Sequence, residues 1–307
     1  MLKLHLDTDI GGDIDDLCAL ALVLNWPGVE LAAVTTVAEH GGKRAGYARH
    51  ALRLAGRTET PVAAGADASL GCYRSWPTLP VEGRYWPEPV APAPTHAGAA
   101  LDLLERSVEQ GAIVAAVGPL TNLAMLERRR PGVLRGARLC VMGGYVFPPR
   151  EGFPAWDGRD DYNVQSDVES ARLVFESASP TLVPLSVTVE TSLRRSHLAA
   201  LDAAGPLARL IARQAVAYAE DENYEGKFGR ACEGLPEDII NFQHDPLACA
   251  VALGWSDGVE VRELTLKTEV EDGWLRQRVE DGGTPARVVT SVDGERFGEF
   301  WLSRVAR

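Results

Sequence analysis

The sequence has few of the features that mark a disulfide framework or a membrane span. Its five cysteines, at positions 18, 72, 140, 232 and 249, are an odd number and widely spaced, unlike the paired cysteines of a secreted scaffold. No apolar run approaches the roughly 18 residues that a membrane span requires, and no charged and apolar leader precedes Leu2. We therefore expect reduced, buried cysteines in a soluble, cytoplasmic protein without a membrane partner.

The sequence also lacks a cluster of lysines or arginines. Its 31 basic side chains are outnumbered by 43 acidic ones, which gives a formal charge of −12. This charge would repel a polyanion, so nucleic acid is excluded as a partner and a small neutral or cationic ligand is favoured. No linker rich in proline, glycine and serine divides the 307 residues, and 46% hydrophobic residues can supply one large core. We expect a single domain over residues 1–307.

The most informative segment is the run Asp7-Thr-Asp-Ile-Gly-Gly-Asp-Ile-Asp-Asp16, which follows the first hydrophobic segment. Gly11 and Gly12 allow a tight turn there, because glycine adopts φ values that a Cβ forbids. Carboxylates at this density suit a hard divalent cation, Ca²⁺ or Mg²⁺, whereas zinc would require histidine or cysteine ligands. An alternative is helix capping, with Asp13 as N-cap of a helix over Ile14 to Leu24 and Asp15 and Asp16 in its first turn. Capping leaves Asp7 and Asp9 unexplained.

Along the chain, short β-branched runs alternate with longer helical patterns, which predicts a doubly wound α/β fold with a mostly parallel sheet. The predicted strands are Val29 to Val37, Ile113 to Val117, Leu139 to Met142 and Leu182 to Val187, and Arg44 to Leu54 and Asn122 to Glu127 are predicted helices. Alternating segments at 262–267 and 286–291 predict late strands before a closing helix at Gly294 to Val305. Two loops, Gly71 to Pro94 and Phe147 to Gly158, are expected near a site mouth or simply on the surface. Ligands of such sheets bind beyond the carboxyl ends of the strands.

Three further polar motifs follow predicted strands. In Gly118-Pro-Leu-Thr-Asn122 and His244-Asp-Pro246, helix capping by Thr121 and Asp245 is a sufficient explanation. Their alternatives are a carbonyl ligand for a metal and a histidine that donates a proton at a helix mouth. The third motif is Asp160-Asp-Tyr-Asn163 followed by Asp167-Val-Glu-Ser-Ala171. Asp167 is the expected N-cap of the helix that follows it. Asp161 and Asn163 lie before that helix and are free to bind hydroxyl groups.

Taken together, these motifs resemble the inosine-uridine preferring nucleoside hydrolase family across essentially the whole chain. Besides the motifs above, Val34-Thr-Thr-Val37 and Val141-Met-Gly-Gly144 occur in the family's order and approximate spacing. The resemblance implies a calcium-dependent hydrolase of ribonucleoside N-glycosidic bonds that assembles as a homodimer or homotetramer. It therefore also implies a ribonucleoside as the small-molecule partner.

The resemblance further implies a role for each matching residue. Asp9 and Asp16 would bind Ca²⁺ through side chains, Thr121 through its carbonyl oxygen and Asp245 through its carboxylate. Asp9 would also take a proton from the metal-bound water, and His244 would assist departure of the base. The expected substrate-binding residues are Asp15, Met142, Asp161, Asn163, His40, Tyr224 and Phe228, with the last two near the leaving base.

The implied chemistry is physically consistent. Breaking a ribosyl C–N bond creates an oxocarbenium-like sugar and an electron-rich base, so carboxylates are needed near the sugar and a proton donor near the base. Three features depart from the family pattern. The first motif is two residues longer than the shortest form, which makes Asp13 an additional carboxylate. His40 occupies an asparagine position and Asp161 a glutamate position, which concerns how the sugar is held.

Two other functions are compatible with parts of the sequence. Asp7-Thr-Asp9 matches the paired aspartates of a haloacid-dehalogenase-like phosphohydrolase, but that class would leave His244 and Asn163 without a role. A catalytically altered homologue would keep the metal pocket and bind ribose or a nucleoside without turnover. Release of free base distinguishes the expected hydrolase from both.

Overall fold

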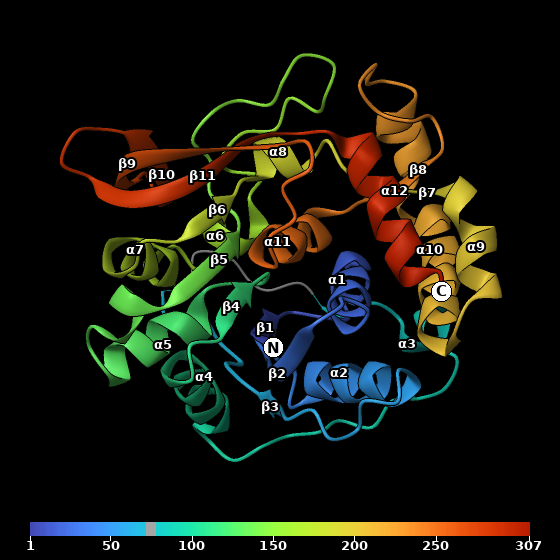
Figure 1. The fold of residues 1–307 in the computed structure, drawn as a ribbon, viewed down its shortest axis with the longest axis horizontal. Helices are drawn as coiled ribbons and strands as arrows, with labels where there is room; N and C mark the ends of the chain where they lie inside the picture. Colours follow the sequence, from blue (N-terminus) through green and yellow to red (C-terminus); the bar gives the residue numbers. More distant parts are fainter. Residues whose placement is uncertain (72–77) are drawn as a thin grey trace.

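The computed structural model describes residues 1–71 and 78–307, and a nine-stranded sheet runs through it (Figure 1). The strand order is β10-β9-β11-β6-β5-β4-β1-β2-β3. The strands are β1 Leu2–Thr8, β2 Val29–Thr36, β3 Val62–Ala64, β4 Ile113–Ala116, β5 Arg138–Met142, β6 Thr181–Val183, β9 Val259–Glu271, β10 Trp274–Val279 and β11 Thr284–Val292. Two further strands, β7 Ser192–Arg194 and β8 Ile239–Phe242, form a separate antiparallel pair.

The pairing of the strands confirms the predicted fold class. β3, β2, β1, β4, β5 and β6 pair in parallel, and β11 joins β6 in parallel as well. The late strands β9 and β10 are antiparallel to their neighbours. Parallel strands bring their carboxyl ends to one edge of the sheet, and the predicted polar motifs follow β1, β4 and β5 at this edge.

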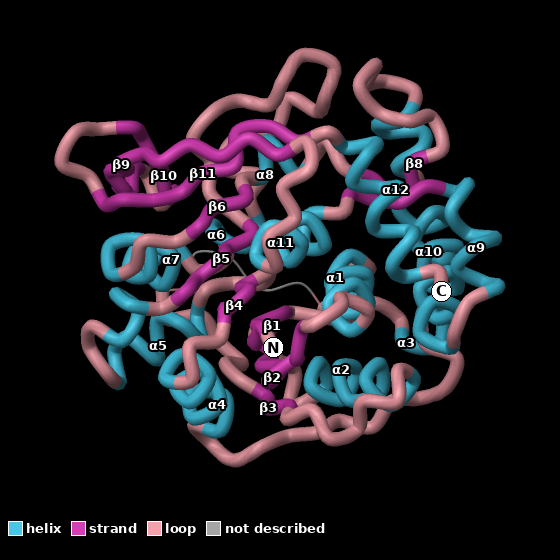
Figure 2. Tube along the Cα trace, viewed as in Figure 1, coloured by secondary structure: helices cyan, strands magenta, loops and turns pink. Residues whose placement is uncertain are grey.

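Helices cover both faces of the sheet (Figure 2). They are α1 Asp15–Leu24, α2 Lys43–Leu54, α3 Glu82–Tyr85, α4 Ala99–Glu109, α5 Thr121–Arg129, α6 Tyr162–Gln165, α7 Val168–Ser177, α8 Leu185–Thr188, α9 Leu198–Ala203, α10 Pro206–Glu222, α11 His244–Ala252 and α12 Gly294–Val305. Helices α4, α5 and α7 pack on one face, and α1, α2 and α11 pack on the other (Figure 1). The closing helix α12 has the predicted bounds.

The central strands are apolar along their whole length because both of their faces are covered. In β4, Val114 and Ala116 belong to the core beneath α4, α5 and α7, whereas Ala115 belongs to the core beneath α1 and α11. All three side chains are fully buried. The unbroken apolar run at 112–117 therefore reflects burial on two sides, as predicted for a parallel strand.

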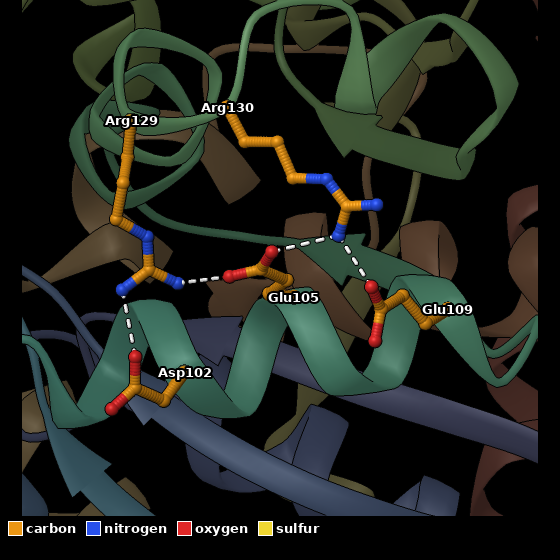
Figure 3. A network of polar contacts seen from close by, with 5 residues as sticks. All are labelled: Asp102, Glu105, Glu109, Arg129 and Arg130. Atoms are coloured by element: carbon orange, nitrogen blue, oxygen red, sulfur yellow. Dashed lines mark hydrogen bonds and ion pairs between the residues drawn. The ribbon is translucent and has the colours of Figure 1, made fainter.

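On the outer surface, α4 and α5 are joined by a network of ion pairs (Figure 3). Arg129 contacts Asp102 at 2.7 Å and also Glu105. Arg130 contacts Glu105 at 2.7 Å and also Glu109. Because these side chains are mostly exposed, water and salt screen their attraction. The network orients two neighbouring helices and contributes little to the buried core.

Several local predictions are wrong in informative ways. The predicted strand Leu182 to Val187 ends at Val183, because Pro184 precedes the short helix α8. Helix α5 begins at Thr121 and α11 begins at His244, so neither Thr121 nor Asp245 is an N-cap. The N-cap of α1 is Ile14 rather than Asp13. In contrast, Asp167 caps α7 as predicted, by accepting a hydrogen bond from the Ser170 backbone.

Two predictions from absences can be compared with the structure. Four cysteines are free, of which Cys18, Cys140 and Cys249 are buried and Cys232 is partly exposed. Cys72 and part of the predicted loop Gly71 to Pro94 lie outside the described residues. Within residues 1–71 and 78–307, no helix has both the length and the apolar character needed to cross a bilayer.

Candidate active site

A cavity of about 280 Å³ lies at the carboxyl ends of the parallel strands. It collects most of the predicted site residues from segments far apart in the sequence, namely Asp9, Asp15, Asp16, Met142, Asp161, Asn163, His244 and Asp245. It is also lined by Gly12, Asp13, Arg44, Val117, Trp156, Asp160, Tyr162 and Leu185. The sheet topology therefore brings the separate motifs into one site.

Three carboxylates of the site lie at helix N-termini. Asp15 and Asp16 occupy the first turn of α1, and Asp245 occupies the first turn of α11. The Asp15 carboxylate accepts hydrogen bonds from the backbone of Asp16 at 3.1 Å and of Asp245 at 3.3 Å. The Thr8 hydroxyl donates to Asp16. Unpaired N–H groups and the helix dipole stabilise negative charge at such positions, so the fold itself gathers these anions.

Three of these carboxylates form a candidate cation site. Asp15, Asp16 and Asp245 each offer an oxygen atom, and these atoms lie within 4.8 Å of one another. All three side chains are buried. Burial raises the pKa of each, and each is raised further by the negative charge of its neighbours. A divalent cation would relieve this repulsion, and a donor set made only of oxygen fits Ca²⁺ or Mg²⁺.

The remaining predicted metal ligands lie outside this cluster. Asp9 lines the cavity, and its carboxylate packs closely against Gly118. A Cβ added to Gly118 would lie 2.8 Å from Oδ1 of Asp9. Burial raises the pKa of Asp9, and the positive charge of Arg44 opposes the shift. Thr121 is fully buried and does not line the cavity, and its hydroxyl donates to Asp167 at 2.6 Å.

Asp7 and Asp13 have structural partners. Asp7 is buried in β1 and accepts hydrogen bonds from the Thr35 hydroxyl and, at 2.8 Å, from Asn122. It therefore ties β1 to β2 and α5. Asp13 accepts from the Asp15 backbone at 3.0 Å and from Asn241 at 2.6 Å. The additional carboxylate thus connects the first motif to β8.

Asp161 and Asn163 lie before helix α7 and do not cap it, as predicted, but they form part of the additional short helix α6 and its N-terminus. Asp161 is the N-cap of α6 and accepts from Val164 at 3.1 Å and from the Gly144 backbone at 2.7 Å. Burial raises its pKa to about 6. The Asn163 amide donates to the carbonyl oxygens of Val117 at 2.9 Å and Met142 at 3.2 Å. Both side chains still line the cavity, in fixed orientations.

His244 lies at the start of α11 with one ring nitrogen already engaged. Its Nδ1 lies 2.6 Å from the Thr188 hydroxyl oxygen. Within the described chain no hydrogen bond or ion pair involves Nε2. Burial lowers the pKa of His244 to about 4, and the negative charge of Asp13 opposes this shift. The imidazole is therefore mostly neutral at pH 7.

Tyr224 and Phe228 lie behind the cavity wall rather than in it. Their ring centroids are 4.9 Å apart, and Phe228 lies 5.3 Å from Trp156, which lines the cavity. Tyr224 precedes a π-helical turn at Glu225–Gly229. The Tyr218 hydroxyl lies 3.3 Å from both the Tyr224 hydroxyl and Asp13. These aromatics contact the site through Trp156 and Tyr218.

His40 is not placed in the site, contrary to the prediction. It is exposed and does not line the cavity. The chain turns away after β2 through Gly41 and Gly42, both at positive φ, and Arg44 from α2 reaches the cavity instead. Sequence reasoning missed Arg44 and Trp156. The only available signal for Arg44 was a basic residue soon after the carboxyl end of a parallel strand.

Comparison with known proteins identifies the family. The profile of the inosine-uridine preferring nucleoside hydrolase family matches residues 4–299. An uncharacterized protein of Schizosaccharomyces pombe is 29% identical, with 100% of this chain and 99% of that protein covered. A pyrimidine-specific ribonucleoside hydrolase, RihA of Salmonella schwarzengrund, is 28% identical over 69% of each chain.

A similar fold occurs in solved structures. The purine-preferring ribonucleoside hydrolase from Gardnerella vaginalis superposes with a TM-score of 0.77 at 24% identity, covering 99% of this chain and 98% of that one. The family match over residues 4–299 does not favour the haloacid-dehalogenase-like phosphohydrolase. The chain belongs to the inosine-uridine preferring nucleoside hydrolase family, and it is an N-glycosidase.

Proposed function

We propose that this protein hydrolyses the N-glycosidic bond of ribonucleosides in a calcium-dependent reaction and releases ribose and free base. One observation carries the proposal. Asp15, Asp16 and Asp245 converge within 4.8 Å in the same cavity as Asp9 and His244. A cation-binding cluster beside a carboxylate and an imidazole matches what cleavage of a ribosyl C–N bond requires.

In this proposal Asp9, Asp16, Asp245 and the Thr121 carbonyl hold the ion, and Asp15 lies beside it. When bound, Ca²⁺ supplies a template for water and vicinal hydroxyl groups and lowers the cost of gathering the carboxylates. The support from this chain is the buried acidic cluster, whose carboxylates would otherwise repel one another. Removal of the ion with a chelator tests the assignment of Ca²⁺ as the cofactor.

Asp9 is proposed as the general base. Asp9 lines the cavity, and its charge acts on Asp16 of the carboxylate cluster. One of its two oxygens can therefore hold the ion while the other accepts a proton from the attacking water. A neighbouring positive charge favours its ionised form, and Arg44 supplies such a charge. Proton transfer to a positioned carboxylate contributes about 10²- to 10⁴-fold to the rate.

His244 is proposed to assist departure of the base. If the Thr188 hydroxyl donates to Nδ1, the proton of the neutral imidazole resides on Nε2. Nε2 can then donate a hydrogen bond to the electron-rich leaving base. The ring centroids of Trp156 and His244 are 6.3 Å apart, so Trp156 adds an apolar surface next to the imidazole.

The sugar is proposed to contact Asp15, Met142, Asp161 and Asn163. The carboxylates of Asp15 and Asp161 place negative charge near the cationic sugar of the transition state. Tyr224 and Phe228 act on the base only through Trp156, which they support by aromatic contacts. His40 has no part in this proposal because it lies outside the cavity.

The proposal leaves the base open, because the relatives include both pyrimidine-specific and purine-preferring enzymes. We further propose that residues 1–307 act as one domain, in a homodimer or homotetramer, in the cytoplasm. Light scattering gives the subunit number.

The test is chromatographic detection of free base from a panel of ribonucleosides and their 2′-deoxy analogues. We expect turnover of at least one ribonucleoside with Ca²⁺, loss of turnover with a chelator, and recovery when Ca²⁺ is added back. The deoxy analogues should react far more slowly, because buried polar groups would lose a partner.

Hydrolysis of p-nitrophenyl phosphate without release of any base would reject the proposal in favour of a phosphohydrolase. Calorimetric binding of ribose without base release would indicate a non-catalytic homologue.

A further inference from the structure

Arg44 introduces positive charge into a cavity that is otherwise acidic. Among the described residues that line the cavity, it is the only lysine or arginine. Its side chain is large and almost fully buried, with 1% exposure. Seven aspartates share the cavity with it: Asp9, Asp13, Asp15, Asp16, Asp160, Asp161 and Asp245. No motif of the sequence analysis accounts for this residue.

Two carbonyl groups hold the guanidinium in place. Its Nε donates to the Ala38 carbonyl at 2.8 Å, and Nη1 donates to the Ile10 carbonyl at 3.2 Å. Ala38 lies two residues after the end of β2 with a φ of 50°, and Ile10 belongs to the aspartate-rich loop. The Arg44 backbone donates to the buried Glu39 carboxylate at 3.2 Å. The arginine head is therefore oriented toward the cavity before any ligand binds.

Part of the hydrogen-bonding capacity of Arg44 is unused. A guanidinium has five N–H donors, and within residues 1–71 and 78–307 only two of them have acceptors. No carboxylate oxygen of the described chain forms an ion pair with it at 4.0 Å or less. Its neighbour Lys43 differs, because it pairs with Glu82 at 2.6 Å. Burial raises the pKa values of Asp9 and Asp16, and the positive charge of Arg44 opposes this shift, so these two carboxylates balance its charge at longer range. The remaining N–H donors of Arg44 have no acceptor among the described residues, and a buried donor without an acceptor is costly, so a function in ligand binding is the simplest compensation.

We infer that Arg44 is a substrate-binding residue whose free N–H groups donate to an acceptor atom of the bound riboside. This inference rests on the proposed function. The acceptor is a neutral oxygen or nitrogen rather than a phosphate, because seven aspartates outweigh one arginine and one divalent cation. Both a sugar oxygen and a base carbonyl or ring nitrogen have this chemistry, and the experiment distinguishes them.

The experiment compares Arg44→Met and Arg44→Lys with the control Lys43→Met at saturating Ca²⁺. The control removes a charge from the same helical turn outside the cavity. For Arg44→Met we expect KM to rise about 10- to 100-fold, as when a hydrogen bond with a charged partner is lost, and kcat to change less. Arg44→Lys should show a smaller rise, and Lys43→Met should keep the KM of the wild type.

Calorimetry with ribose and with the nucleoside locates the acceptor. Equal weakening of both ligands by Arg44→Met places it on the sugar, and weakening of the nucleoside alone places it on the base. The calcium affinity of Arg44→Met distinguishes a role of Arg44 in substrate binding from a role in holding the aspartate-rich loop in place. Loss of a nearby positive charge should leave calcium affinity unchanged or tighter, whereas a loosened aspartate-rich loop would weaken it.

Several outcomes would overturn the inference. An unchanged KM in Arg44→Met would do so, and so would a rise in KM that is accompanied by weaker calcium binding. If Arg44→Met does not fold, Arg44→Lys decides, because an unchanged KM there contradicts a role for the guanidinium fork. A wild-type protein that releases no base from any riboside would refute the proposed function, and the inference would fall with it.

Discussion

Gly11 provides a quantitative test of how the aspartate-rich loop is built. Its φ is +101°, and a Cβ at this position would lie 2.3 Å from Cδ2 of Tyr47 and 2.7 Å from Cε2. The Tyr47 ring is 1% exposed and stacks on Trp86 with centroids 4.3 Å apart, so it cannot move away easily. Gly11→Ala therefore combines backbone strain with a steric clash.

The expected loss can be divided into two parts. Positive φ costs a residue with a Cβ about 1–2 kcal/mol, and overpacking a well-packed core costs about 1–3 kcal/mol more. Gly28→Ala is the matched control, because Gly28 has a φ of +73° and a Cβ added there would meet no atom within 4 Å. Both variants change the entropy of the unfolded chain equally. The difference between them should therefore be about 1–3 kcal/mol.

The assay is urea-induced unfolding followed by far-ultraviolet circular dichroism. A third variant, Gly12→Ala, should be milder than Gly11→Ala, because its nearest contact would be Arg44 Nη1 at 3.7 Å. The double variant Gly11→Ala/Tyr47→Ala should cost less than the sum of its single variants, since removal of the ring relieves the clash. Equal losses for Gly11→Ala and Gly28→Ala, or strict additivity in the double variant, would refute the proposed contact.

Three other predictions test different parts of the molecule. His244→Ala should slow nucleoside hydrolysis more than hydrolysis of p-nitrophenyl riboside, whose leaving group needs little help, and equal losses in kcat/KM would refute the assignment. Burial lowers the pKa of His5 to about 3, so its contribution to stability is complete above its ordinary pKa of about 6.5 and is lost as the pH falls toward 3. Between about pH 6.5 and 5.5, urea unfolding of the wild type should lose about 1 kcal/mol more than His5→Gln, and identical pH slopes would contradict this. Arg130→Ala should lower the midpoint of thermal unfolding only slightly in low salt and less in high salt, because exposed ion pairs are screened, and a large loss that persists in high salt would mean that the exposed network is more than a surface feature.

The sequence predicted the elements that depend on local patterns. The apolar run around Val114 and the polar motifs after the strands were sufficient for the sheet, because burial on both faces leaves a clear signature. Asp167 was correctly placed as an N-cap. The predicted helix boundaries were less accurate at Thr121 and Asp245. Both residues were predicted to precede their helices, but they lie in the first turns of α5 and α11. A displacement of one residue at Thr121 and of two at Asp245 is enough to change the role of the side chain.

The candidate site was predicted in composition but not in arrangement. The sequence did not predict that Asp15 joins Asp16 and Asp245 in the tightest cluster, where its carboxylate also accepts from the start of α11. Its contact with the sugar stays a prediction. The contact between Asp15 and Asp245, which are 230 residues apart, has no local signal. His40 and Arg44 show the same limit, since the turn after β2 determines which of the two faces the cavity.

The most direct test of the whole account is the rate of base release by Asp9→Asn at saturating Ca²⁺ and substrate. This substitution keeps the size of the side chain and removes its ability to accept the proton. We predict a loss of about 10²- to 10⁴-fold in kcat relative to the wild type, with an unchanged circular dichroism spectrum. Turnover near that of the wild type would contradict the assignment of Asp9 as the base.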